Sequence, residues 1–146
     1  MEAKESKFNI TEKIREIRSA REELRKAVKR ESICCTPMLR DFSLVPKLYR
    51  MYCELVGGVS KSDTDARRVF IFVVQYFYAP RSMFGGFMPR GLRRVLVSFL
   101  GVKALSVVSK HASETGPRYL AYRGFRENVN RIFEQMTAWM QDEGII

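Results

Sequence analysis

Residues Arg67–Tyr78, RRVFIFVVQYFY, give the strongest indication of the fold class of this chain. Apolar side chains occupy nearly every position after the two arginines, which predicts a buried central helix. The β-branched and aromatic residues would also suit a strand. Ser62 and Asp65 form a helix-capping pattern before the stretch, and Pro80 follows it, so a helix ending near Tyr78 is the better prediction. We therefore expect an all-α protein, a helical bundle built around this helix.

An N-terminal arm of residues 1–33 is expected to precede a helical domain of residues 36–146. Asn9 and Glu12 form an N-x-x-E cap at the start of an amphipathic helix. Its apolar residues recur at steps of four and three, with Arg21 at the one position that breaks the series. These residues are Ile10, Ile14, Ile17, Leu24 and Val28. The first interpretation is that this stripe packs against the rest of the chain, and a short dimeric coiled coil is the alternative.

Capping and turn residues predict the other helices. Thr36 and Pro37 are typical of an N-cap followed by the first helical residue. A helix over 44–56 should stop at Gly57-Gly58, and residues 79–91 are expected to form a loop. Further helices are expected over 92–100, over 105–114 with Gly116-Pro117 as the stop, and over 119–141. The apolar seam of the last helix is Phe125, Val129, Ile132, Met136 and Trp139 or Met140.

Residues 92–114 have the outline of a helix-turn-helix, with Gly101 at the turn. The inner face of the first helix would be Leu92, Val95, Leu96, Phe99 and Leu100. Val102 would fill the angle between the helices, and Leu105 and Val108 would hold the second helix against the first. The polar residues left outward on and near the second helix are the expected base-reading residues. They are Lys103, Ser106, Ser109, Lys110, His111 and Ser113.

The positive charge of the chain is concentrated in one segment. Residues 67–126 hold eleven Lys and Arg residues and one acid, Glu114, so this segment alone has the net charge of +10 that the whole chain has. Such a field suits a polyanion, most often nucleic acid. The expected phosphate-binding residues are Arg67, Arg68, Arg81, Arg90, Arg93, Arg94, Arg118, Arg123 and Arg126.

Within this segment the chain resembles the C-terminal DNA-binding domain of the bacterial replication initiator DnaA, a Trp-repressor-like helix-turn-helix. Arg68-Val69-Phe70 would open the family's long helix, and Leu100-Gly101-Val102 would stand at its turn. Val108 follows Gly101 by seven residues, as the family's valine follows its first glycine, and His111-Ala112 falls near the family's His-Ala pair. The resemblance covers residues 67–113 and implies the fold and duplex-DNA binding.

Two departures from the family limit what the resemblance implies. The family's base-reading Asp-His-Thr is Ala104-Leu105-Ser106 in this chain, and the GxxxxGK[ST] motif of an ATPase domain is missing. Initiator activity is therefore not expected. A short basic protein with this motif is similar to regulators of phages and mobile elements.

Other functional classes are less favoured by the sequence. No convergent acids and bases suggest an enzyme, and no cofactor or metal is expected, because the three cysteines lack CxxC spacing and His111 is the only histidine. No apolar run is long enough to span a membrane and no signal peptide is recognisable, so the bacterial cytoplasm is the expected location.

Three alternatives stay open. A phage structural, assembly or small terminase-like packaging protein would place its basic face against an acidic protein subunit, and its location would be the virion if it is structural. An RNA-binding protein would use the basic aromatic loop at 79–91. A homodimer could form through the N-terminal or the C-terminal helix.

Overall fold

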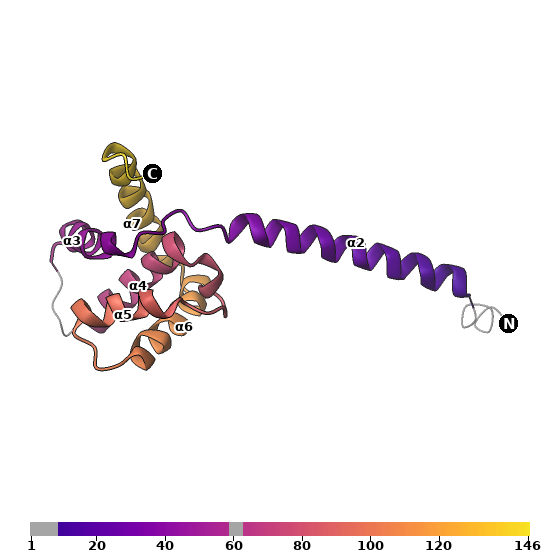
Figure 1. Cartoon of the computed structure of the whole chain (residues 1–146), viewed down its shortest axis with the longest axis horizontal. Coiled ribbons are helices and arrows are strands. Elements are labelled where there is room, and N and C mark those ends of the chain that lie inside the picture. The colour runs from indigo at the N-terminus through magenta and orange to yellow at the C-terminus, as the bar shows by residue number, and fades with distance from the viewer. Residues whose placement is uncertain (1–8, 59–62) are drawn as a thin grey trace. The chain divides into compact units, whose positions relative to one another are not determined.

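The computed structural model describes residues 9–58 and 63–146, and these residues form helices without a single strand (Figure 1). This confirms the all-α prediction. The chain divides into two compact units, residues 1–35 and residues 36–146. No described helix has the length and apolar character needed to cross a membrane.

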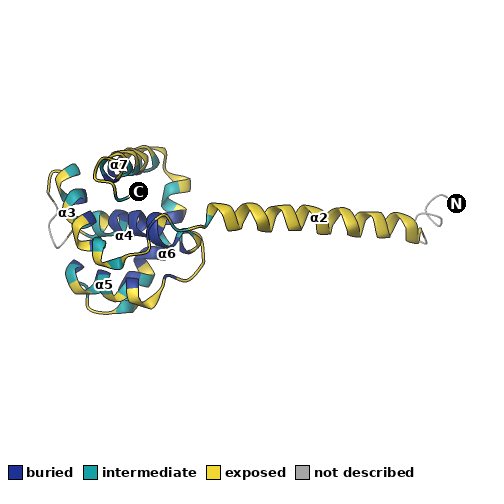
Figure 2. Ribbon diagram, turned by 45° about the horizontal axis from the view of Figure 1, so that its top comes forward, coloured by how far each residue is buried: buried dark blue, intermediate teal, exposed yellow. Residues whose placement is uncertain are grey.

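The first unit contains one helix, α2 (Ile10–Cys34). The Asn9 side chain accepts a hydrogen bond from the Glu12 backbone N–H at 3.0 Å, which confirms the predicted cap. No residue of α2 is buried, and Figure 2 shows the helix coloured as exposed along its whole length.

The second unit is built around α4 (Thr64–Tyr78), which confirms the predicted central helix. Every residue from Val69 to Tyr78 except Tyr76 is buried (Figure 2). The Asp63 carboxylate accepts from the Ala66 N–H at 3.0 Å, so Asp63 is the N-cap. The predicted cap, Ser62, lies outside the described residues. This cap at the start of α4 supports helix over strand, as the sequence pattern indicated.

The prediction that a helix begins at Thr36-Pro37 is wrong. The Met38 and Leu39 N–H groups both donate to the Phe77 carbonyl, at 3.0 and 2.9 Å. These bonds hold the segment against the C-terminal end of α4, where carbonyls lack partners within the helix. Helical structure resumes at η1 (Phe42–Leu44), capped by Asp41, and continues in α3 (Val45–Leu55).

The loop expected over 79–91 is shorter, because it contains the turn η2 (Pro80–Ser82) and ends where α5 (Arg90–Leu100) begins. Buried Gln75 holds this turn, since its Nε2 donates to the Ser82 carbonyl at 3.0 Å. Gly101 ends α5 with a φ of 70°, a left-handed conformation that glycine adopts without strain, as the sequence predicted.

The predicted stop of the next helix at Gly116-Pro117 is wrong. Helix α6 (Leu105–Ala121) continues through Pro117, although a proline inside a helix costs about 3 kcal/mol. Thr115 and Gly116 are buried, so tertiary packing holds this part of the helix. A Cβ atom at Gly116 would lie 2.5 Å from the Met83 carbonyl oxygen. Close approach of the 83–88 loop, rather than helix termination, therefore explains this glycine.

The last helix, α7 (Arg123–Asp142), begins four residues later than predicted because Tyr119 belongs to α6 and Tyr122 is extended. Its seam is buried within the second unit at Val129, Ile132, Met136 and Met140. Phe125 and Trp139 are half-buried. The seam is thus covered inside its own unit. A homodimer through the C-terminal helix stays a prediction.

Candidate nucleic-acid interface

Helices α5 and α6 contact each other, and α6 also packs on α4. Leu92, Leu96 and Leu100 form the buried face of α5. Val95 and Phe99, also expected on this face, are half-buried against the core, as is Val102 after the turn. Val108 is fully buried and Leu105 is half-buried. The apolar spacing therefore identified the inward faces of both helices.

The outward face of the first half of α6 is a polar stripe. Ser106, Lys110 and Ser113 are exposed at steps of four and three, and Lys103 is exposed in the turn before the helix. The Ser113 hydroxyl donates to the Lys110 carbonyl at 2.8 Å, which leaves its oxygen free to accept. Four of the six residues predicted to read bases thus lie on or beside one exposed surface.

Ser109 is half-buried and joins α6 to α5. Its hydroxyl donates to the Leu105 carbonyl at 3.3 Å and accepts from the Arg93 Nη1 at 3.3 Å. Arg93 is also half-buried. The contact between these two predicted site residues therefore links the helices and reduces what either offers to a ligand.

His111 does not belong to the exposed stripe, and its predicted base-reading position is wrong. The residue is 6% exposed and its Nδ1 lies 3.9 Å from the Glu114 carboxylate. Burial lowers the pKa of the imidazole, and the Arg68 guanidinium lowers it further, while Glu114 acts in the opposite direction. An imidazole on the inner side of α6 cannot reach a groove that the outer side enters.

Two of the predicted phosphate-binding arginines are neutralised by carboxylates. Arg68 Nε lies 2.7 Å from Glu114, and Arg68 Nη1 lies 3.3 Å from Asp65. Arg118 Nη1 donates to Asp65 at 3.0 Å, and this hydrogen bond is the main cause of the lowered pKa of Asp65. These ion pairs link the start of α4 to α6. Asp65 precedes the basic segment by two residues, so counting charge within the segment overlooked it.

Three more of these arginines have partners within the second unit. Arg123 pairs with Glu127 at 2.9 Å, one turn along α7. Arg126 donates to the Leu120 carbonyl and Arg67 to the Thr64 hydroxyl, at 3.3 and 3.2 Å. Of the remaining arginines, Arg81 is exposed in η2 but has an interaction with another residue.

Arg90 and Arg94 are exposed, one turn apart on α5. Together with Lys103 and Lys110 they form the group that we name the cation face. None of the four has an ion pair with a carboxylate among residues 9–58 and 63–146. An exposed cation attracts a polyanion most strongly when no neighbouring carboxylate neutralises its charge.

A cavity of about 590 Å³ lies beside this surface, between the 82–88 loop and α6. Arg93, Ser109 and Ser113 contribute to its walls. Phe84 and Phe87 of the loop are 60% and 97% exposed. The sequence indicated a loop able to approach a partner but did not identify these two rings as outward. Their position on either side of Gly85-Gly86 was the available signal, since Gly85 has a φ of 114°.

No three His, Cys, Asp or Glu side chains of the described chain gather as metal ligands would. The chain matches no protein-family model, no curated protein and no solved structure.

Proposed function

We propose that this protein binds duplex DNA through the outward stripe of α6, with α5 against the phosphate backbone. The cation face carries this proposal, because its four exposed cations lie on two contacting helices and in the turn between them, without an ion pair among the described residues. The exposed residues of α6 include no acid. Glu114, the one acid of α5 and α6, is half-buried beside Arg68.

Each part of this surface has a matching chemical role. Ser106 and Ser113 have short side chains that can hydrogen-bond base edges in the major groove. The flexible Lys110 side chain can contact a base edge and neutralise a neighbouring phosphate. Arg90 and Arg94 would contact phosphates. Ala104 gives α6 no side-chain cap, so the N–H groups of Leu105 and Ser106, together with Lys103, suit a further phosphate. The role as a regulator of a phage or mobile element stays a prediction.

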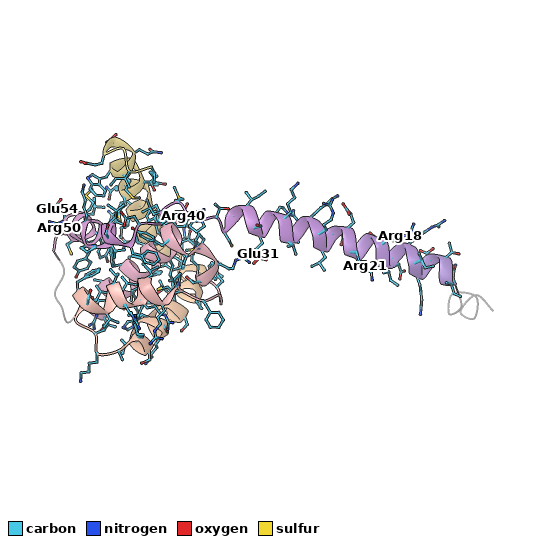
Figure 3. The ribbon with its side chains drawn as sticks, viewed as in Figure 1. Arg18, Arg21, Glu31, Arg40, Arg50 and Glu54 are labelled. Atoms are coloured by element: carbon cyan, nitrogen blue, oxygen red, sulfur yellow. The ribbon has the colours of Figure 1, made fainter. Side chains whose placement is uncertain are left out.

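Fluorescence anisotropy with labelled random-sequence duplex tests the proposal. The double variant Arg94→Ala/Lys110→Ala should weaken binding strongly at low salt. Arg50→Ala is the matched control, because Arg50 is an exposed arginine on α3 (Figure 3). Unchanged binding by the double variant, or an equal loss in the control, contradicts this docking.

The two exposed rings favour a second candidate, the binding of single-stranded nucleic acid such as RNA. Phe84 and Phe87 could stack on unpaired bases, which duplexes do not offer. Competition between duplex DNA and single-stranded RNA separates the two candidates, since Phe87→Ala should weaken only the second mode.

A further inference from the structure

The apolar stripe of α2 is a large exposed surface that the proposed DNA-binding face does not use. Its side chains Ile10, Ile14, Ile17, Leu24 and Val28 are 47–71% exposed. Contiguous exposed apolar surface of this kind marks an interaction site. The stripe keeps a heptad spacing, so the partner surface that it fits is another amphipathic helix.

The charges beside the stripe have one sign. In the heptad register with Ile14 at position a, Arg21 falls on the seam at a second a position. The flanking e and g positions carry Lys13, Arg18 and Arg25 and no acid. Figure 3 shows Arg18 and Arg21 extending from α2. Of these four cations only Arg25 has a described ion pair, with Glu22 of the same helix at 2.7 Å.

Four of the five acids of the helix lie away from the seam, and Glu31 falls on it at the last d position. Glu12, Glu16, Glu22 and Glu23 occupy b, c and f positions, where four basic residues also lie. The outer face is therefore mixed in charge, while the face beside the stripe is purely basic. Flanking charges select the partner of a coiled coil, and like charges opposed across it are unfavourable.

A second copy of the chain is a poor occupant for this reason. In a parallel pair, Arg21 would face Arg21 of the second copy, and Lys13 would face its Arg18. In an antiparallel pair, Arg18 would face Arg25 of the second copy. An anionic lipid surface suits the stripe less well, because helices that bind membrane surfaces bury a broad apolar face, while this stripe is a narrow a and d seam without an aromatic residue.

We propose that α2 binds an amphipathic helix of a different protein, one with Glu or Asp beside its own apolar stripe. The acids of that helix would pair with Lys13, Arg18 and Arg21 while the two stripes bury each other. The proposal is independent of DNA binding, since it uses none of the residues of the cation face.

Two synthetic peptides as long as α2 test the proposal with the full chain. Both carry the same Ile and Leu seam, one with Glu and the other with Lys at every e and g position. In about 100 mM salt the chain should sediment as a monomer and bind the Glu peptide at least about tenfold more tightly than the Lys peptide. Arg18→Glu should reduce that preference.

Variants on opposite faces of α2 identify the surface that binds. Ile17→Asp should abolish binding of the Glu peptide, while Ser19→Asp, which adds the same group at an outer position, should retain it. Circular dichroism of both variants shows whether α2 stays helical. Three results overturn the proposal: a dimer that Ile17→Asp dissociates, binding to anionic vesicles without binding to the Glu peptide, or equal affinity for the two peptides.

Discussion

The salt dependence of DNA binding distinguishes the charge seen in the structure from the charge counted along the sequence. Neutralising phosphates releases counterions, so the logarithm of affinity falls with the logarithm of salt concentration with a slope of about −0.9 per contact. The cation face supplies four cations without an ion pair in the described part of the chain, Arg90, Arg94, Lys103 and Lys110. Four contacts predict a slope of about −3.6.

This slope has a measurable size. Raising the salt from about 50 to about 200 mM should weaken binding about 150-fold. If all eleven basic residues of the 67–126 segment bound phosphates, the slope would be about −10 and the loss would approach a millionfold. Lys110→Ala should reduce the slope by about 0.9, which leaves a loss of about 40-fold over the same range.

Anisotropy titrations at four or more salt concentrations give these slopes. Arg123→Ala is the informative control, since Arg123 is exposed but already paired with Glu127 at 2.9 Å and should leave the slope unchanged. A wild-type slope near −10, or an equal reduction by Arg123→Ala and Lys110→Ala, would refute the reasoning. Sequence preference adds a second readout, because Lys110→Ala should change it and Arg94→Ala should weaken all sequences alike.

Three further outcomes are expected. Gly116→Ala should lower the free energy of unfolding by about 1–3 kcal/mol in urea titrations, because its Cβ would meet Met83 O at 2.5 Å. Gly124→Ala, also helical but with open space around its Cβ, should instead raise it by about 0.5–1 kcal/mol, and a loss at both positions would contradict the packing argument. Because burial lowers the pKa of His111, the imidazole binds a proton more readily in the unfolded chain than in the folded one. The free energy of unfolding is therefore highest above the ordinary pKa of histidine and decreases as the pH falls through and below that value. Urea midpoints between about pH 8 and pH 5 should show this loss, and His111→Gln should reduce it. Asp63→Ala should remove the cap of α4 at a cost of about 0.5–2 kcal/mol, measured as a lower urea midpoint.

The helices were predictable wherever their signals are local. Asn9 caps α2 and Gly101 ends α5, and both act on atoms within one turn of themselves. The predictions at Pro37 and Gly116-Pro117 were wrong because distant groups outweighed local preference. After Pro37, the Met38 and Leu39 N–H groups donate to the Phe77 carbonyl. At Gly116, the Met83 carbonyl packs closely against the helix.

The candidate site was likewise predicted correctly at some residues and wrongly at others. Apolar spacing correctly left Ser106 and Lys110 outward, since residues four apart on a helix share a face. The same rule places His111, three residues after Val108, on the buried face of α6. The polar character of its ring led to the wrong prediction that it faces outward.

The all-α class, the central position of α4, the inward faces of α5 and α6, and the excess of positive charge could all be predicted from the amino-acid sequence. These follow from periodicity and composition, which are properties of neighbouring residues. Which charges have partners depends on contacts between residues distant in the sequence. Asp65 and Arg118 are 53 positions apart in the chain, yet their side chains are hydrogen-bonded at 3.0 Å. The strength of a charge depends on what lies within a few ångströms of it, and folding sets those neighbours.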